Sequence, residues 1–247
     1  MPAGKGRENR VASPNELKVL STTAMKMVFE ELAPALENAA GCRLAVTLGP
    51  SLQLEKRLLD GETADVVIVT RAGAEDLAAR GKIAAGSLVD VARSLIGVCV
   101  AKGAARPDLS SVEGFKQAML NAKSIALSKP VGGGASGAHM AKVFERLGIA
   151  AAVQAKAKYG AGGAGGLAAL VVLRGEAEIG IQQMAELLAV PDSDVVGPLP
   201  VALQGVTQFT AAVPSSAQHR DAARLLIDFL TKPAAKRVIK AKGLEPN

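Results

Sequence analysis

The stretch Ala64-Asp65-Val66-Val67-Ile68-Val69-Thr70 is apolar at nearly every position and rich in β-branched residues. A short run of this kind is typical of a strand that is buried on both faces of a parallel sheet. The chain before it predicts two more strands, each followed at once by a helix: strands at 17–21 and 43–48, helices at 24–38 and 52–59. With a short helix at 74–80, this segment has the β-α-β-α-β-α order of a parallel α/β sheet.

The same β-α pattern continues along the rest of the chain. We predict further strands at 94–101, 124–128, 154–158, 178–182 and 206–213, with helices at 112–121, 138–147, 167–174, 184–188, 221–230 and 233–242. The simplest arrangement is a two-lobe α/β protein in which each lobe is a mostly parallel sheet flanked by helices. Its expected parts are a disordered leader at 1–16, lobe 1 at 17–97 plus 204–247, lobe 2 at 98–203, and crossover strands near 94–101 and 203–213.

The composition excludes several classes of function. Of the 247 residues, 49% are hydrophobic and only 2% are aromatic, with no Trp. The apolar content excludes a disordered chain, and the scarcity of aromatic rings argues against binding sites built on stacking. The net charge of +6 comes from scattered residues, and its densest run, 232–242, has the spacing of a solvated helix face. We therefore expect no nucleic-acid partner but a favourable encounter with a small anion.

Cysteine, metal and membrane signals are weak. Cys42 and Cys99 form no CxxC pair, so two buried thiols are favoured over a disulfide, and no metal site or cofactor is expected. No segment has the roughly 18 apolar residues of a membrane-spanning helix, so no membrane insertion is expected. The segment 1–16 is polar and is not a secretory signal as it stands. Either the protein is cytoplasmic, or an export signal has been removed.

Several loops lie where a strand passes directly into a helix. The first turn of a helix carries unpaired N–H groups and the positive end of the helix dipole, which together favour an anion. One such loop alone is more often a simple cap or turn. Their convergence across a cleft would make a small-anion site without a metal, and the candidate loops are 21–24, 49–51, 129–137, 160–166 and 181–183.

A dinucleotide fingerprint is also present by spacing. Gly160-x-Gly162-x-x-Gly165 matches the glycine pattern of an NAD-binding turn. It lies late in the chain, however, and its only candidate acidic partner, Glu186, falls in a predicted helix rather than at a strand end. NAD binding is therefore kept only as an alternative.

Catalytic motifs are few. The chain has two histidines, and His139 falls near the start of the helix that follows the first glycine-rich loop. A surface or packing role is the commoner one for such a residue, but His139 is also a candidate base. We find no Gly-x-Ser-x-Gly elbow, no paired carboxylates and no Walker motif.

Four stretches carry a resemblance to a known family: Val19–Met25, Ser51–Gly61 followed by Ala64–Ile68, Ala135–His139, and Leu170–Ile181 with its Arg-Gly-Glu-Ala sequence. From Leu17 to its end, the chain resembles the type 2 periplasmic solute-binding proteins of ABC transporters, in particular the molybdate/tungstate-binding branch. The resemblance implies two lobes that close on an oxyanion. It also implies a periplasmic location if a signal was removed, and a possible ABC transporter permease as partner.

The resemblance also implies positions for the ligand contacts. They fall at Thr22, Thr23 and Ala24, at Ser51, at Ser136 with Gly137, at Gly165 and at Gln183. Four departures from the family pattern stand out: Ala24 replaces a Ser, Gln183 a Tyr and Arg71 an Asp, and Ala135-Ser136-Gly137, preceded by extra glycines, replaces a Pro-Ala-Gly. Because Arg can hold a carboxylate through two hydrogen bonds, Arg71 favours an anion larger than molybdate, such as an organic carboxylate.

The function expected from the sequence is therefore a solute-binding protein that holds a small oxyanion or organic carboxylate between its lobes for ABC-type uptake. Relatives of this group include aconitate isomerases, which move a double bond by proton transfer. A cofactor-independent isomerase of an unsaturated di- or tricarboxylate is thus the alternative, with His139 as its only evident base. We expect a binding protein rather than an enzyme.

Overall fold

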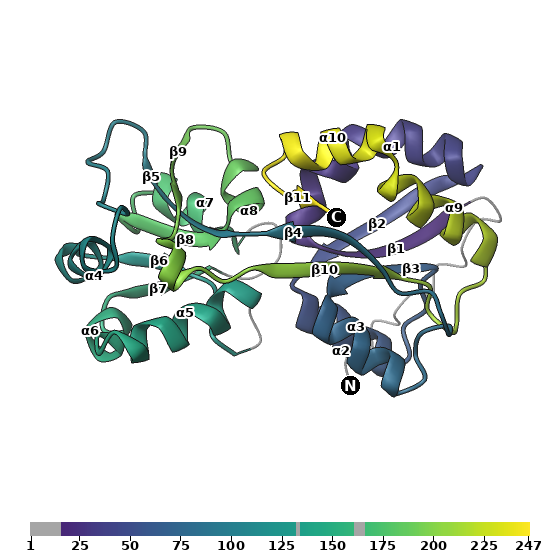
Figure 1. Ribbon diagram of the computed structural model, residues 1–247, viewed down its shortest axis with the longest axis horizontal. Coiled ribbons are helices and arrows are strands. Elements are labelled where there is room, and N and C mark those ends of the chain that lie inside the picture. The colour runs from purple at the N-terminus through teal and green to yellow at the C-terminus, as the bar shows by residue number, and fades with distance from the viewer. Residues whose placement is uncertain (1–15, 132–133, 161–165) are drawn as a thin grey trace, which may run out of the picture.

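The computed structural model describes residues 16–131, 134–160 and 166–247. It has two lobes, each a sheet covered by helices on both faces (Figure 1). The predicted two-lobe α/β fold is confirmed. Both sheets are mixed rather than mostly parallel, because strands that pass between the lobes run against the β-α units.

Lobe 1 is built on a six-stranded sheet of order β11-β4-β10-β3-β1-β2. The strands are β1 (Glu16–Thr22), β2 (Arg43–Gly49), β3 (Val66–Thr70), β4 (Val89–Ser94), β10 (Thr207–Ala212) and β11 (Glu245–Pro246). β1 pairs in parallel with β2 and β3, as the first β-α units predict. β10 pairs antiparallel with both β3 and β4, and β11 with β4.

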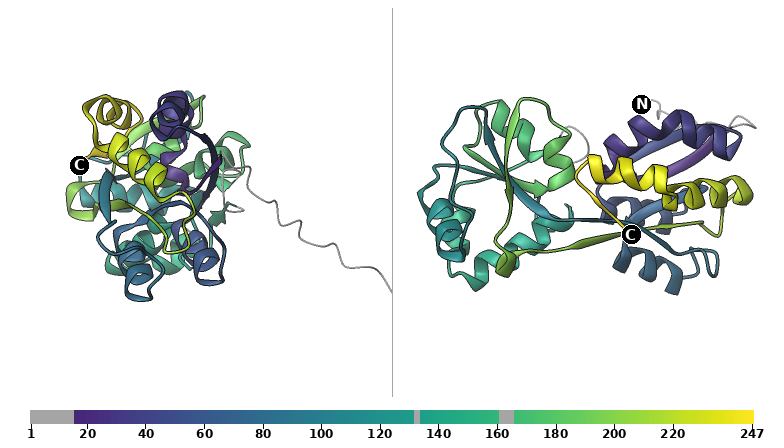
Figure 2. Two further views of the ribbon diagram at one scale, coloured as in Figure 1. Left: turned by 90° about the vertical axis from the view of Figure 1, so that its right-hand side faces the viewer. Right: turned by 45° about the horizontal axis from the view of Figure 1, so that its top comes forward.

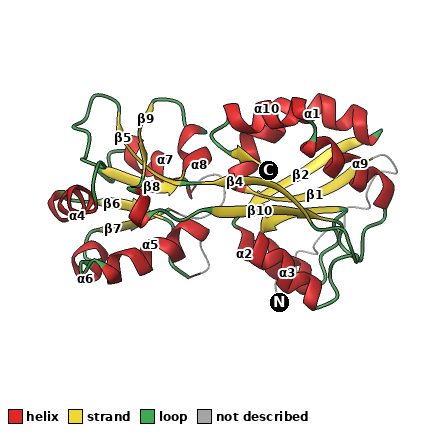
Figure 3. Ribbon diagram, in the orientation of Figure 1, coloured by secondary structure: helices red, strands yellow, loops and turns green. Residues whose placement is uncertain are grey.

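Helices cover both faces of this sheet (Figure 3). One face carries α1 (Lys26–Ala40), α9 (Arg220–Thr231) and α10 (Pro233–Ala241), and the other carries α2 (Ser51–Leu59) and α3 (Arg71–Ala79). A hydrophobic core lies on each face of the sheet, and alternate residues of β3 pack into each one. Val66 and Ile68 pack on the side of α1, and Val67 and Val69 pack on the side of α2 and α3. The strand is apolar throughout because both of its faces are buried.

Two helices of lobe 1 begin before their predicted starts. Helix α3, predicted at 74–80, begins at Arg71, because Thr70 caps it by accepting from the Gly73 N–H at 3.2 Å. Helix α2, predicted at 52–59, begins at Ser51, with Pro50 as its N-cap.

Lobe 2 is built on a five-stranded sheet of order β7-β6-β8-β5-β9. Its strands are β5 (Ile96–Ala101), β6 (Ile125–Leu127), β7 (Ala157–Tyr159), β8 (Ile179–Gln183) and β9 (Ser193–Pro198). One face carries α4 (Val112–Asn121), α5 (Ala135–Arg146) and α6 (Ala150–Gln154), and the other α7 (Ala168–Leu173) and α8 (Met184–Leu188). Phe115 and Phe144 stack in this core with ring centroids 6.5 Å apart.

The chain passes between the lobes along two extended segments that lie side by side (Figures 1 and 2). The single strand predicted at 94–101 is divided at Leu95, because β4 pairs within the first sheet and β5 within the second. The return segment runs from β9 through the turn η3 (Val201–Leu203) into β10. β9 and β11 have no counterpart among the predicted strands.

The structure shows no disulfide between the two cysteines, and none of the described helices could span a membrane. Cys42 and Cys99 are both free; Cys99 is fully buried, and burial raises its pKa to about 12, whereas Cys42 is only partly buried. Within the described ranges, no helix combines the length and apolar character needed to cross a bilayer.

Asp65 is a buried carboxylate that joins three parts of lobe 1. Its Oδ1 accepts from the backbone N–H groups of Gln218 and His219, both at 2.9 Å, and its Oδ2 accepts from that of Lys18 at 3.0 Å. The side chain therefore ties β1 to the start of α9, since His219 is the N-cap of that helix.

Asp65→Asn should lower the free energy of unfolding by about 2 kcal/mol, because an amide places N–H groups against buried donors. Urea denaturation of the two proteins measures this difference. The matched control is Asp60→Asn, whose exposed carboxylate pairs, among the described residues, only with Lys56, and we expect a change below about 0.5 kcal/mol there. Equal losses in both variants would contradict the assignment.

Candidate functional site

A cavity of about 250 Å³ lies between the lobes. We call it the interlobe cavity. Lobe 1 lines it with Thr22, Thr23, Pro50, Ser51, Gln53 and Phe209. Lobe 2 lines it with Ser128, Lys129, Val131, Gly134, Ala135, Gly160, Gly166, Gln182, Gln183 and Glu186. Most of these residues lie where a strand ends and a helix begins, as the loop pattern predicts.

Two longer helices begin at this cavity from opposite lobes. α2 starts at Ser51 in lobe 1, and α5 starts at Ala135 in lobe 2. The N-cap residues Pro50 and Gly134 make no side-chain capping bond, so no N-cap side chain competes with a ligand for the first two N–H groups of either helix. Two positive helix ends facing one cavity favour a small anion.

The predicted contacts fall into three groups. Thr22, Thr23, Ser51 and Gln183 line the interlobe cavity, and all four are buried. Ala24 is buried in the core between β1 and α1 and is absent from the lining. Gly165 lies outside the described residues.

Ser136 and Gly137 lie behind the cavity wall rather than on it. Ser136 is buried, and its Oγ lies 3.4 Å from that of Ser128, which does line the cavity. A Cβ on Gly137 would come within 2.4 Å of the Lys129 carbonyl oxygen, so only glycine lets α5 pack this closely against the preceding loop. These two residues support the site through Ser128 and Lys129.

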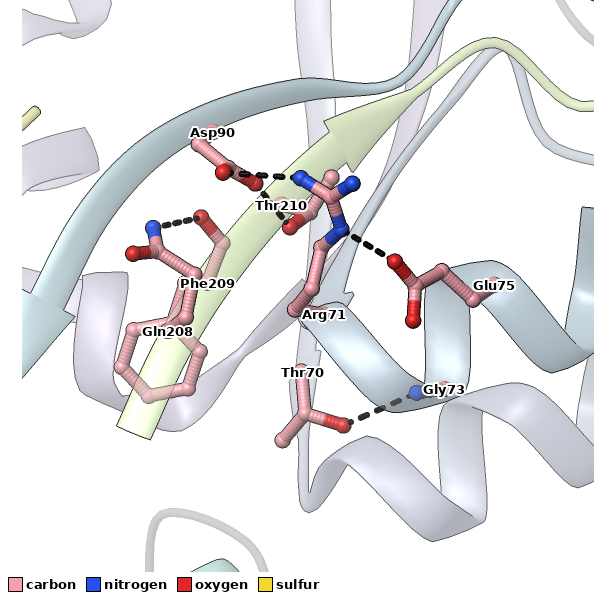
Figure 4. A network of polar contacts seen from close by, with 8 residues as sticks. All are labelled: Thr70, Arg71, Gly73, Glu75, Asp90, Gln208, Phe209 and Thr210. Carbon is pink, nitrogen blue, oxygen red and sulfur yellow. Dashed lines mark hydrogen bonds and ion pairs between the residues drawn. The ribbon is translucent and has the colours of Figure 1, made fainter. Parts of the chain in front are cut away.

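Arg71 is held elsewhere (Figure 4). Its guanidinium donates to Glu75 at 2.6 Å and to Asp90 at 2.8 Å, and Asp90 also accepts from the Thr210 hydroxyl at 2.6 Å. Both carboxylates raise the pKa of Arg71, and the side chain does not line the cavity. We therefore assign Arg71 to a network that joins α3, β4 and β10, and not to ligand neutralisation.

His139 also faces away from the interlobe cavity. Its Nε2 donates to the Leu203 carbonyl at 2.8 Å, in the segment that returns to lobe 1. Its ring packs on Gly205, where an added Cβ would lie 2.7 Å from Nδ1. This histidine is engaged with the backbone of the crossover segment, so its geometry does not suit a base in the cavity.

Glu186 is an acid of the interlobe cavity that the sequence analysis considered only as a partner for NAD. Among the described lining residues it is the sole carboxylate, and Lys129 is the sole cation. Burial raises the pKa of Glu186 from 4.5 to about 7, while hydrogen bonds from the Gln182 side chain and the Gln183 backbone oppose that rise. The position of Glu186 in the first turn of α8 resembles an ordinary capping glutamate, which is why the pattern alone did not distinguish it.

Gln183 presents an unpaired polar atom to the site. Its Nε2 donates to Thr207 Oγ1 at 2.8 Å, and its Oε1 is buried without a partner among the described residues. Because a hydroxyl can donate as well as accept, the amide can also turn and direct its N–H groups into the cavity. In either orientation one end of the amide is left without a hydrogen-bond partner among the residues that the structure describes.

The geometry of the interlobe cavity does not support the alternative of NAD binding. Gly162 and Gly165 lie outside the described residues. Glu186, the proposed ribose partner, belongs to the first turn of α8 and lines a cavity of about 250 Å³, which is compact for a dinucleotide. In the described ranges 16–131, 134–160 and 166–247, no group of three or more His, Cys, Asp and Glu side chains could hold a metal ion.

Sequence comparison gives two findings. The family model described as "Bacterial extracellular solute-binding protein" matches residues 17–245. A curated protein named "Aconitate isomerase", from Pseudomonas sp, is 36% identical over 236 residues, which cover 93% of this chain and 87% of that protein.

Solved structures support the same fold. The periplasmic molybdate-binding protein of Azotobacter vinelandii superposes with a TM-score of 0.75 at 21% identity, over 92% of this chain and 98% of that one. The tungstate-binding protein TupA of Desulfovibrio alaskensis gives a TM-score of 0.63 at 14% identity, over 94% and 99% of the two chains. At these identities the similarity shows the fold alone.

Proposed function

Because this chain belongs to the bacterial extracellular solute-binding protein family and carries a titratable carboxyl in its interlobe cavity, we propose that it is a cofactor-independent isomerase of an unsaturated tricarboxylate. Aconitate is the proposed substrate, since the Pseudomonas aconitate isomerase is 36% identical over nearly the whole chain. The observation that carries the proposal is the position of Glu186 in the cavity.

The reaction needs one base and no redox partner. Aconitate contains a CH2 group between a carboxylate and a carbon–carbon double bond. Removal of one proton from this carbon leaves a carbanion delocalised over the allyl system and the adjacent carboxylates. Return of a proton to the former vinyl carbon moves the double bond, and either geometry can form. One C–H bond breaks and another forms, so the atoms and electrons balance.

Glu186 suits the base in this scheme. A pKa of about 7 leaves the carboxyl close to half ionised at neutral pH, which combines a sizeable population of the basic form with useful proton affinity. An unperturbed glutamate would be ionised but a much weaker base. The same carboxyl can accept the first proton and then serve as the acid that returns one.

The remaining lining groups would hold the carboxylates of the substrate. We propose that Thr22, Thr23 and Ser51 donate their hydroxyl groups, that Gln183 donates its amide, and that the first turns of α2 and α5 donate backbone N–H groups. Donors aimed at the developing enediolate would stabilise it more than the ground state. We take lobe 1 as residues 17–97 plus 204–247 and lobe 2 as residues 98–203. Closure of these two lobes would exclude water around the bound anion.

The test is to incubate the purified protein with cis-aconitate and, separately, with trans-aconitate. We expect both reactions to approach the same mixture, as measured by chromatography. A preparation treated with a chelator should behave alike. Failure of either isomer to convert, with binding still detected by calorimetry, would overturn the isomerase proposal.

That outcome would favour the second candidate, a binding protein that delivers an organic anion to an ABC transporter. One specific observation supports it: the starts of α2 and α5, whose N-caps make no side-chain bond, line the cavity from opposite lobes. A protonated Glu186 would then act as a hydrogen-bond donor to the ligand. The family description supports a location outside the cytoplasm for this role.

Lys129→Gln should raise KM for aconitate about tenfold with little change in kcat, because the positive charge contributes about equally to substrate and transition-state binding. Steady-state kinetics at two salt concentrations measures this, and the salt dependence of KM should weaken in the variant. Lys142→Gln is the matched control, since Lys142 is exposed on α5 and does not line the cavity. An unchanged KM for Lys129→Gln would contradict the role.

A further inference from the structure

We infer that Gln182 is a positioning residue that connects the N-terminus of α7 to Glu186 and stabilises the ionised carboxylate there. The inference rests on the proposed function only in calling Glu186 the base. Gln182 lies on β8, which has β6 and β5 as neighbours on its two sides, and its side chain is buried. The central strand of the sheet thus holds this amide in a rigid setting.

The orientation of the Gln182 amide is determined by its partner. Its Oε1 accepts from the Ala168 backbone N–H at 2.6 Å. A backbone N–H can only donate, so the oxygen must face Ala168 and the NH2 group must face the other way. Ala168 is the first residue of α7, whose N-cap Leu167 supplies no side-chain bond. Gln182 therefore provides the acceptor that this helix end otherwise lacks.

Gln182 and Glu186 line the same cavity, and the NH2 group of Gln182, which faces away from Ala168, is the donor that lowers the pKa of the Glu186 carboxyl against the effect of burial. A buried carboxylate without donors would be strongly disfavoured relative to its neutral form. The Gln183 backbone N–H is the second donor, and it belongs to the N-cap of α8. Of the two, only the Gln182 donor can be removed by a side-chain substitution.

Few other charges act on Glu186. The strands β5, β8 and β9 and the turn η1 (Thr23–Met25) pack against α8, and their titratable side chains are Cys99 and Asp194. Cys99 stays neutral because burial raises its pKa to about 12, and Asp194 is paired with Arg106 at 2.6 Å. The segment after α10 that touches Leu188 carries Lys242, which pairs with Glu31, and Lys129 lies on the cavity wall.

Two substitutions separate the roles of Gln182. Gln182→Met removes both the acceptor for Ala168 and the donor to Glu186. Gln182→Glu keeps an acceptor for Ala168 but replaces the donor with a second carboxylate. If Gln182 acts on Glu186 through its N–H, both variants should raise the pKa of Glu186. Gln182→Met decides between the two roles, because it adds no charge beside Glu186: if Gln182 acts only by capping α7, this variant should lose stability and leave the midpoint of Glu186 unchanged.

The experiment is a carbon-13 NMR titration of the glutamate carboxyls in the unliganded protein, with Glu186→Gln identifying the relevant signal. We expect a midpoint near 7 in the wild type and midpoints higher by about one pH unit in both variants. An unchanged or lower midpoint in Gln182→Met would overturn the inference. Should Gln182→Met fail to fold, Gln182→Leu, which also removes the N–H donor without adding a charge, takes its place.

This readout is independent of catalysis. Raised midpoints in a protein that does not isomerise aconitate would uphold the inference and refute the proposed function. Unchanged midpoints in a protein that does isomerise aconitate would refute the inference and uphold the proposed function. In an active enzyme, the acid limb of the kcat/KM profile should also move to higher pH in both variants.

Discussion

Replacing Glu186 with glutamine is expected to lower kcat for aconitate isomerisation by about 10³-fold, because the amide cannot take the proton from the substrate. Glutamine has nearly the same shape and still accepts a hydrogen bond from Gln182, so the cavity should persist. Calorimetric Kd values for aconitate should therefore change by less than about tenfold. Kinetics and calorimetry on the same preparations separate catalysis from binding.

Glu113→Gln is the matched control for this substitution. Glu113 also lies in the first turn of a helix, α4, but it is exposed and bonds only Gln117 at 2.7 Å among the contacts seen. Its replacement should leave kcat within about twofold. If Glu186→Gln retained most of the wild-type kcat, Glu186 would not be the base.

The same Glu186→Gln substitution should stabilise the protein at alkaline pH. The pKa of Glu186 in the folded protein is about 7, above its ordinary value of 4.5. For a raised acid pKa, the associated stability is fully present below the unfolded value and is lost as pH rises through the folded value. Between pH 4.5 and 7 this loss amounts to about 3 kcal/mol.

Glutamine at this position carries no charge to desolvate. We expect the free energy of unfolding of Glu186→Gln to exceed that of the wild type by about 3 kcal/mol at pH 8 and to match it closely at pH 4.5. Urea denaturation at both pH values measures the difference. Equal stability of the two proteins at pH 8 would show that Glu186 is not held in a desolvated site. A gain in stability with a loss of activity is typical of residues kept for function.

Local sequence patterns predicted much of the fold because its first units are regular. The parallel β1, β2 and β3 with their connecting helices follow from apolar runs and helix-ending signals such as Gly41, whose φ of 69° is the left-handed region that glycine tolerates. The break at Leu95 and the strands β9 and β11 escaped prediction. Their existence depends on pairing partners far away in the sequence, which periodicity does not reveal.

The location of the site could be predicted from the sequence, but several of the side chains that line it could not. Strand-to-helix junctions brought Thr22, Thr23, Ser51 and Gln183 to one cavity. Arg71 and His139 have the chemistry expected of a site, but Asp90 and the Leu203 carbonyl engage them elsewhere. Those partners are tertiary neighbours, so only the folded structure reveals them.

Burial explains why the acid was overlooked. Glutamate in the first turn of a helix is ordinary, and its type says nothing of its pKa. The lobes enclose this carboxyl and thereby turn an ordinary acid into one that titrates near neutrality. The lack of aromatic residues fits the same picture, since Phe209 is the one ring among the described lining residues and the other groups are mostly hydroxyls, amides and glycines.

The most direct test of the account is hydrogen exchange into aconitate in deuterated water, followed by proton NMR. The wild-type protein should introduce deuterium at the CH2 and vinyl positions as the isomers interconvert, and Glu186→Gln should introduce almost none over the same period. Wild-type protein that binds aconitate without any exchange would contradict the central claim that Glu186 moves a proton of the bound substrate.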